Sequence, residues 1–387
     1  MKTASDSSAK LFQNLKPYVY IILLQFGYAG MYVISTATLK NGMNHYVLVV
    51  YRNLVAAAII APFALWFERK NRPKITPLIF FKIVALALLE PVLDQNFYYV
   101  GAKLTNASFS AAFYNILPAV TFMLAIILRM EKINIKRRRS QAKVIGTAIT
   151  LVGAILMILY KGPIVEFFWT VGRAQHHISP AASAVSQGGT MTWLKGTSML
   201  FISCISWSLF FLLQSNTLES YPAELTLTTL ICAIGALLST TVALVMERGS
   251  VKPWIIGLDM RLFTAVYSGI VCSGVAYCVQ GIVMKERGPV FVTAFNPLCM
   301  IITALMGSII FAEEISLGRI IGAAIIVIGL YFLIWGKSND HLASSSSNSA
   351  KKEVTDQLPV AMASTNDTKP GFAESPILIE IPAVKNP

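Results

Sequence analysis

Residues 225–246 read LTLTTLICAIGALLSTTVALVM, an apolar stretch of 22 residues that contains no charged side chain. At a rise of about 1.5 Å per residue, a helix of this length crosses a hydrocarbon core of about 30 Å. Residues 46–67, YVLVVYRNLVAAAIIAPFALWF, have the same length and contain a single charged residue, Arg52. Both stretches therefore predict membrane-spanning helices.

Composition extends this conclusion to the whole chain. Of its 387 residues, 55% are hydrophobic and 13% are charged, and the mean hydropathy is +0.62. One soluble core cannot hide that much apolar surface, so we predict an integral, multi-pass membrane protein. We place ten membrane crossings at residues 17–36, 46–67, 79–101, 107–128, 144–160, 197–216, 225–246, 262–283, 289–311 and 318–335.

The two halves of the chain repeat one another. An offset of 179 residues aligns Glu68-Arg69, after the second crossing, with Glu247-Arg248, after the seventh. Compositional likeness among apolar helices is the alternative explanation, but ordered agreement along the whole length argues against it. Further matches, at offsets of 182 and 176, align Phe109 with Phe291, Ala112-Phe113 with Ala294-Phe295, Gly146 with Gly322 and Gly153 with Gly329.

An odd number of crossings in each repeat turns the second copy upside down in the membrane. The sequence thus predicts an all-α membrane protein of ten transmembrane helices in two inverted five-helix repeats, residues 17–160 and 197–335. Lys and Arg concentrate before the first crossing and after the second and fourth, which predicts that both termini are cytosolic. We therefore expect residues 1–16 to be a cytosolic N-terminus, residues 161–196 an extracytosolic linker and residues 336–387 a disordered cytosolic tail.

Several other functions are disfavoured. The formal net charge of +13 could indicate a nucleic-acid partner, but the basic run 137–139 lies in a short loop between crossings, where orientation and contact with anionic lipid headgroups are expected. His176-His177 could suggest a metal, yet the chain has only four histidines, so we predict neither a metal nor a cofactor. We find no phosphate loop, nucleophile elbow or helical His pair, and we predict no enzyme.

Charged residues inside the third crossing point to a functional site. Glu90 and Asp94 are four residues apart, so an α-helix places both carboxylates on one face, and Pro91 between them invites a kink. Arg52 lies at a depth similar to that of Asp94, which makes these two residues a candidate ion pair. Such groups are costly in the bilayer and mark transport pathways; the alternative is a purely structural pair in which Arg52 partly reaches the interface. Gln95 and Asn96 follow directly in the sequence.

Paired helix breaks give a second indication. Asn115 and Pro118 in the fourth crossing match Asn296 and Pro297 in the ninth, and such breaks in both halves are typical of a substrate site near the midplane, although ordinary proline kinks are an alternative. The sequence predicts alternating access around a cavity near these residues and the charged group. Candidate cavity-lining side chains are Gln25, Tyr98, Tyr114, Trp207, Tyr277 and Gln280.

Several strings together carry a family resemblance. They are residues 24–30 (LQFGYAG), 51–52 (YR), 94–96 (DQN), 161–163 (KGP), 221–223 (YPA), 288–291 (GPVF), 296–298 (NPL) and 335–337 (WGK). In these strings the chain resembles the plant nodulin-type (UMAMIT-like) carriers of the drug/metabolite transporter superfamily, which have two EamA-type repeats. The resemblance covers nearly the whole of residues 24–337.

This resemblance implies a secondary transporter of amino acids or related small organic solutes, bidirectional or export-biased. It implies the plasma membrane, with the vacuolar membrane as the alternative. Auxin or another metabolite is the alternative substrate within the same fold, and a non-transporting receptor or scaffold is the alternative from another class. The expected partners are a small-molecule substrate and membrane lipids. The sequence does not indicate a particular oligomeric state.

Overall fold

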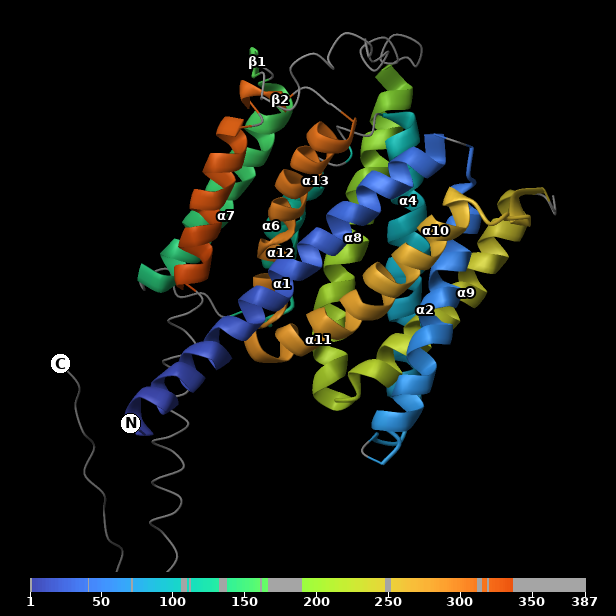
Figure 1. Ribbon diagram of the computed structural model, residues 1–387, viewed down its shortest axis with the longest axis horizontal. Coiled ribbons are helices and arrows are strands. Elements are labelled where there is room, and N and C mark those ends of the chain that lie inside the picture. The colour runs from blue at the N-terminus through green and yellow to red at the C-terminus, as the bar shows by residue number, and fades with distance from the viewer. Residues whose placement is uncertain are drawn as a thin grey trace, which may run out of the picture. The chain divides into compact units, whose positions relative to one another are not determined.

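The computed structural model describes residues 2–40, 42–70, 72–105, 110, 113–131, 138–160, 162–165, 190–247, 252–311, 315–318 and 320–336. Regular structure in these parts is helical, apart from one short antiparallel pair of strands, β1 (Ile164–Val165) and β2 (Ile315–Ser316) (Figure 1). The predicted all-α class is therefore confirmed. Most of the predicted linker, including His176-His177, and the tail from residue 337 lie outside the described residues.

Helices of the first half begin at ordinary capping signals. Asn44 caps α2, because its side chain accepts a hydrogen bond of 2.9 Å from the backbone N–H of Tyr46. Thr76 caps α3 in the same way, and Pro77 follows at a position where no N–H is needed. The elements are α1 (Lys2–Lys40), α2 (His45–Phe67), α3 (Pro77–Ala87), η1 (Leu88–Asp94), α4 (Gln95–Leu104), η2 (Tyr114–Ile116), α6 (Leu117–Ile127) and α7 (Arg138–Leu159).

The second half contains a matching series. Asp259 caps α10 through the backbone N–H of Arg261, and Gly288, with a φ of 83°, separates α11 from α12. The elements are α8 (Thr190–Ser220), α9 (Glu224–Met246), η6 (Lys252–Trp254), α10 (Met260–Tyr267), η7 (Ser268–Val275), α11 (Ala276–Arg287), α12 (Pro289–Ala294) and α13 (Asn296–Phe311). A last apolar helix covers residues 320–336.

Two π-helical segments lie at matching places in the third and eighth predicted crossings. They are η1, which contains Pro91, and η7, which contains Gly269 and Gly274. Proline lacks the backbone N–H that an α-helix needs, and the wider π turn accommodates this loss. Both segments leave the i→i−4 pattern, so their carbonyl groups can accept hydrogen bonds from other helices.

Six helices of the described chain are long and apolar enough to cross a membrane: residues 15–39, 45–67, 191–220, 224–246, 260–287 and 289–310. Three shorter apolar helices cover residues 114–127, 140–156 and 320–336. The remaining predicted crossing, residues 79–101, falls on the continuous run of α3, η1 and α4. All ten predicted crossings therefore contain helix in the structure.

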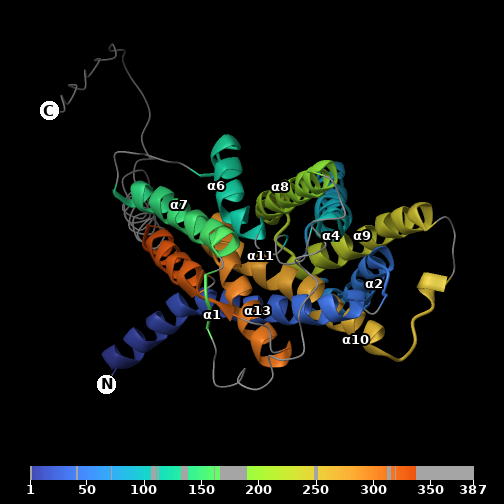
Figure 2. The ribbon, with the colours of Figure 1, turned by 90° about the horizontal axis from the view of Figure 1, so that it is seen from above.

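Helices of the first half pack mainly against helices of the second half. α2 packs along α9, α4 packs on α8, and α1 packs on α10 and α11. The third predicted crossing thus contacts the sixth, while the eighth contacts the first. α7 lies beside residues 320–336, as the views of Figures 1 and 2 show, and Gly146 and Gly329 face each other where these two helices touch. The largest buried cluster includes Trp207, Phe210 and Tyr277 between α8 and α11.

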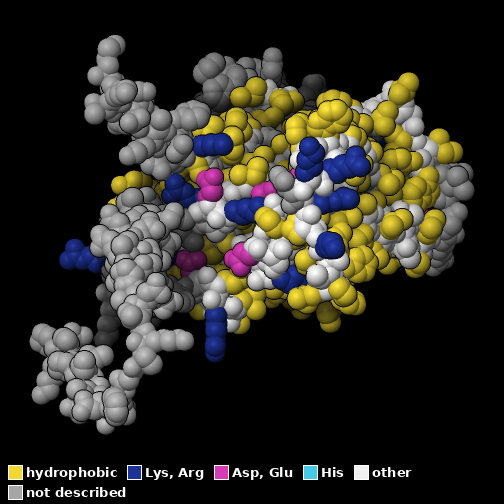
Figure 3. Space-filling view, turned by 90° about the horizontal axis from the view of Figure 1, so that it is seen from below, with side chains coloured by type: hydrophobic (Ala, Val, Ile, Leu, Met, Phe, Trp, Pro, Cys, Tyr) yellow, Lys and Arg dark blue, Asp and Glu magenta, His cyan; other side chains and the backbone are white. Residues whose placement is uncertain are grey.

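The surface agrees with a membrane environment. Large apolar side chains are exposed along the described helices, among them Leu23, Phe81, Leu237 and Ile310. Figure 3 shows that Lys and Arg side chains gather on one end of the bundle, where apolar side chains surround them. Exposed basic residues follow the end of α2, namely Arg69, Lys70, Arg72 and Lys74, and Lys16 is exposed within α1.

Some boundaries differ from the sequence expectation. α1 begins at Lys2 and so extends beyond the crossing predicted at residues 17–36, and α8 begins at Thr190, before the crossing predicted at residues 197–216. Hydropathy detects only the apolar part of a helix, so polar turns beyond it were assigned to the terminus and the linker. The fourth crossing, predicted to start at residue 107, is described as a continuous element only from Tyr114.

Candidate functional site

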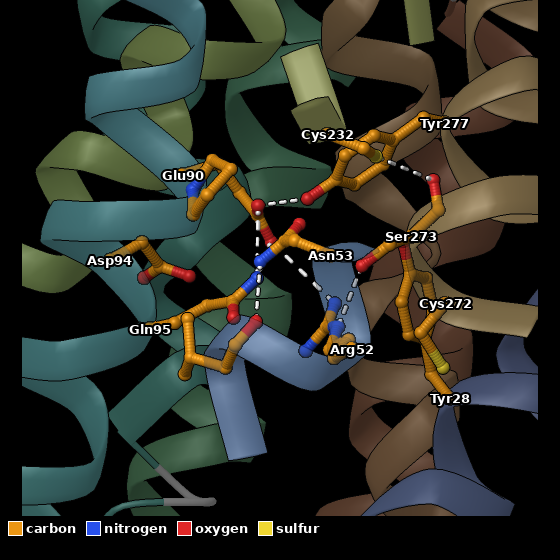
Figure 4. A network of polar contacts seen from close by, with 12 residues as sticks. Tyr28, Arg52, Asn53, Glu90, Asp94, Gln95, Cys232, Cys272, Ser273 and Tyr277 are labelled. Atoms are coloured by element: carbon orange, nitrogen blue, oxygen red, sulfur yellow. Dashed lines mark hydrogen bonds and ion pairs between the residues drawn. The ribbon is translucent and has the colours of Figure 1, made fainter. Parts of the chain in front are cut away.

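Arg52 lies about two turns after the start of α2, and its exposed fraction is only 6%. Its Nε donates a hydrogen bond of 2.7 Å to the hydroxyl of Ser273 in η7. Its Nη2 lies 3.7 Å from Oε1 of Glu90 in η1. The guanidinium therefore connects the π-helical segments of the two halves, as Figure 4 shows.

Glu90 is the anionic partner of this pair and is 4% exposed. The side-chain amide of Gln95 donates to both carboxylate oxygens, at 2.9 and 3.0 Å, and the hydroxyl of Tyr277 donates to Oε2. Gln95 is five residues further along the chain, the spacing that a π turn brings together. Glu90 thus receives donors from its own helix, from α11 and from α2.

Asp94 forms a separate polar group on the same helix and is 6% exposed. Its Oδ1 accepts hydrogen bonds of 2.6 Å from the hydroxyls of Tyr114 and Ser203. These two hydroxyls also contact each other. The carboxyl of Asp94 therefore joins η1 to the start of the fourth crossing and to α8.

A cavity of about 40 Å³ opens between these groups. Since about 10–15 Å³ of such space holds one water molecule, this cavity suits a few waters and is too small for an amino acid. The lining residues are Tyr28, Met31, Tyr32, Arg52, Glu90, Asp94, Gln95, Tyr98, Tyr99, Tyr114 and Trp207.

Aromatic rings form most of the wall. The ring of Tyr114 lies 4.9 Å from that of Tyr98, at 89°, and 5.2 Å from that of Trp207. Tyr28 contacts Trp207 edge to face at 6.4 Å. Such rings present negative faces to a cation, so a cavity with two carboxylates and several aromatic rings favours a positively charged group.

The structure corrects two predicted details. The predicted pair of Arg52 with Asp94 is wrong, because Arg52 contacts Glu90 instead. The local helix is π and not α, so the i and i+4 positions of Glu90 and Asp94 do not have α-helical geometry. Asp94 binds two hydroxyls, and its carboxyl is separate from the Arg52–Glu90 pair. The alternative that Arg52 reaches the interface also fails, since the side chain is buried.

Other predicted site residues lie away from the cavity lining. Asn96 donates to the carbonyl of Val92, and Asn115 donates to Sδ of Met300 at 2.8 Å. Gln280 bonds Gln214 and accepts from Tyr28 at 3.4 Å, so it lies next to a lining residue. Tyr277 reaches the site through Glu90. Three further residues are buried in the packing between helices: Pro118, Pro297 and Gln25. Asn296 is half-buried at the start of α13.

Sequence reasoning missed several contributors. Tyr28, Tyr32 and Tyr99 line the cavity, while Ser203 and Ser273 supply hydroxyls to the charged groups. Tyr28 belongs to the string at residues 24–30 that carries the family resemblance, and Tyr99 lies one turn after Gln95. Both could therefore have been selected from the sequence as candidate lining residues. The two serines had none, because a single serine in an apolar helix is common.

Within the part of the chain that the structure describes, no group of three His, Cys, Asp or Glu residues is placed to hold a metal ion. All five cysteines are buried and free. The arrangement is instead a buried ion pair with a second carboxyl beside it, enclosed by aromatic rings and contributed by both halves of the chain.

Comparisons with known proteins identify the family. The EamA-like transporter family matches residues 15–159 and 194–335. The WAT1-related protein At1g21890 of Arabidopsis thaliana is 54% identical over 334 residues, which cover 85% of this chain and 86% of the relative. The WAT1-related protein At4g08300 of the same plant is 52% identical over 352 residues, which cover 91% and 92%.

A solved crystal structure resembles this chain at 16% sequence identity and a TM-score of 0.59, covering 81% of this chain and 98% of that one. This likeness concerns the fold alone. The family match and the apolar helices agree in describing an integral multi-pass membrane transporter of a small-molecule substrate, and not an enzyme. The chain belongs to the EamA-like transporter family.

Proposed function

We propose that the protein is a secondary transporter that moves amino acids across the plasma membrane by alternating access. Its scaffold would be ten crossings in two inverted five-helix repeats, with both termini in the cytosol. The single observation that carries this proposal is the buried Arg52–Glu90 ion pair with Asp94 beside it, in a small cavity where the two halves meet.

The contacts between α2 and α9 support the inverted arrangement. Glu68, after α2, accepts hydrogen bonds from the backbone N–H groups of Leu225 and Thr226 at the start of α9, at 2.9 and 2.7 Å. Glu247, after α9, accepts one from the side chain of Asn44, which caps α2. Each helix therefore ends beside the start of the other, so α2 and α9 run in opposite directions.

The charges of the site support a zwitterionic solute. An amino acid carries one carboxylate and one ammonium group, and the cavity offers a guanidinium at one side and the carboxyl of Asp94 at another. Arg52 can form planar, two-point contacts with a carboxylate. The aromatic wall and Asp94 suit the ammonium group. A simple organic anion such as auxin would meet two carboxyl groups and one cation, which makes it the weaker candidate.

Expansion of the cavity is part of this proposal. The 40 Å³ of space cannot hold an amino acid, so the helices around it must separate before binding. The π-helical segments η1 and η7 contribute the ends of the polar network and lie at equivalent places in the two halves. Their irregular hydrogen bonding makes them suitable places for the helices to bend.

The test is a flux measurement with purified full-length protein in liposomes. We expect a radiolabelled mixture of the twenty amino acids to leave the vesicles faster than from protein-free liposomes. Asp94→Asn and Arg52→Gln should each lower this rate at least tenfold, whereas Glu219→Gln, at an exposed position outside the cavity, should not. Wild-type protein that is folded and moves none of the amino acids would exclude the assignment.

Two further measurements separate the alternatives. Flux of radiolabelled indole-3-acetic acid in place of amino acids would favour an auxin carrier. Binding of amino acids without any flux would favour a receptor. Transport that persists unchanged in both charge variants would show that the ion pair only holds helices together.

A further inference from the structure

The charged groups of the cavity do not balance. Arg52 contributes one positive charge, and Glu90 and Asp94 contribute two negative charges if both are ionised. The ion pairs of the described residues give no second cation at this site. A net negative charge that is buried at this depth is costly, so one of the carboxyl groups needs a proton or a cationic ligand.

Glu90 has the surroundings of an ionised carboxylate. Both of its oxygens accept hydrogen bonds from Gln95, Tyr277 donates to one of them, and Arg52 lies 3.7 Å away. A carboxylate is a pure acceptor, whereas a protonated carboxyl must also donate. Arg52 can only donate, and its positive charge stabilises the ionised form of Glu90, so the proton does not belong on this residue.

In the part of the chain that the structure describes, Asp94 has only neutral hydrogen-bond partners. Its Oδ1 accepts hydrogen bonds from the hydroxyls of Tyr114 and Ser203, and the hydroxyl of Ser203 also lies 3.1 Å from the backbone carbonyl oxygen of Asp94. The guanidinium of Arg52 forms its ion pair with Glu90. Asp94 is therefore the carboxyl without a cationic partner among the described residues, and a proton on it would remove the excess negative charge.

Apart from Arg52, the described residues place no cation near Asp94. Within electrostatic reach of Asp94 lie one cation, one further carboxyl and several groups that are neutral at physiological pH. They are Arg52 of α2, Glu90 of η1, Tyr32 of α1, Tyr98 and Tyr99 of α4, Tyr114 of η2 and Cys204 of α8. Arg52 is already engaged by Glu90 and Ser273.

We propose that Asp94 carries an exchangeable proton while the cavity is empty, and that the ammonium group of a transported solute takes the place of this proton. The proposal rests on the transport function proposed above and adds its coupling ion. The O–H bond of the carboxyl breaks, the proton leaves to water on the side to which the site is open, and the carboxylate then pairs with the ammonium group. Release of the solute on the other side returns a proton from that side, so one proton moves against one solute.

Infrared difference spectroscopy tests the protonation itself, without any solute. Purified wild-type protein should show the carbonyl-stretching band of a protonated carboxylic acid. Asp94→Asn should lose this band, whereas Glu219→Gln, which changes an exposed carboxylate outside the cavity, should keep it. Ser203→Ala retains the carboxyl and should shift the band, because one hydrogen bond to Oδ1 of Asp94 is lost. A spectrum in which neither Asp94→Asn nor Ser203→Ala changes the band would overturn the proposal.

A flux measurement tests the coupling. In liposomes whose lumen is one pH unit more acidic than the outside, with the membrane potential held at zero, one-for-one exchange should concentrate the radiolabelled amino acid mixture about tenfold inside. Asp94→Asn should at most equilibrate it. Wild-type transport that ignores the pH difference would overturn the exchange and leave the carrier function intact. Absence of all transport would overturn the carrier function, while the infrared band would still report on Asp94.

Discussion

Glu68, directly after α2, holds the start of α9 through Thr226: one carboxylate oxygen accepts hydrogen bonds of 2.7 Å from both the backbone N–H and the hydroxyl of Thr226. The other oxygen accepts from the backbone N–H of Leu225 at 2.9 Å. The first N–H groups of a helix have no partner within it, and the helix dipole favours an anion there. Glu68 therefore caps a helix of the opposite half.

Glu68→Gln should lower the free energy of unfolding by about 1.5–3 kcal/mol, the range for hydrogen bonds to charged groups. The amide removes the charge and turns one acceptor into a donor that faces backbone N–H groups. Unfolding in detergent, followed by circular dichroism, measures the change. Glu219→Gln is the matched control, since Glu219 is an exposed carboxylate at the end of α8. Equal stability of the two variants would contradict the capping role.

The contact of α7 with residues 320–336 leads to a second prediction. A Cβ at Gly146 would lie 2.6 Å from the backbone N of Leu333 and 2.7 Å from the carbonyl oxygen of Gly329. Backbone atoms cannot rotate away, so Gly146→Ala must push the two helices apart. We expect a loss of about 1–3 kcal/mol of stability, as for overpacked interiors.

Gly257→Ala is the control for this substitution. The nearest atom to its added Cβ would be a carboxylate oxygen of Asp259 at 4.0 Å, so the change should be close to neutral. The same unfolding measurement applies to both variants. If Gly146→Ala were as stable as the control, the close approach of the two helices would be disproved.

The membrane class and the helix positions could be predicted from the sequence because apolar length is a local property. The stretch at residues 225–246 coincides with α9 (Glu224–Met246) to within one residue. The match of Glu68 with Glu247 also had a structural cause, since both carboxylates hold the start of the partner helix. Polar extensions such as the first turns of α1 and α8 could not be found, because hydropathy does not register them.

The candidate site could be predicted only in part. Buried charge singled out Arg52, Glu90 and Asp94, and all three line one cavity. The pairing was wrong because depth along two helices does not fix rotation about them, and the π turn rotates Glu90 and Asp94 away from their α-helical positions. Ser203 and Ser273 depend on contacts between distant helices, which one sequence does not encode in any local pattern.

The Arg52–Glu90 pair gives the last prediction. Both side chains are buried, and Nη2 of Arg52 lies 3.7 Å from Oε1 of Glu90, so removal of one partner leaves an unpaired, buried charge. Arg52→Gln and Glu90→Gln should each cost about 3–5 kcal/mol of stability. The double variant has neither charge, and its loss should be clearly smaller than the sum of the two single losses. Free energies of unfolding for the four proteins give the coupling energy directly. Additive losses would mean that the two groups do not interact. The hydrogen bonds from Gln95 and Tyr277 would then have to stabilise the buried carboxylate of Glu90 without the guanidinium.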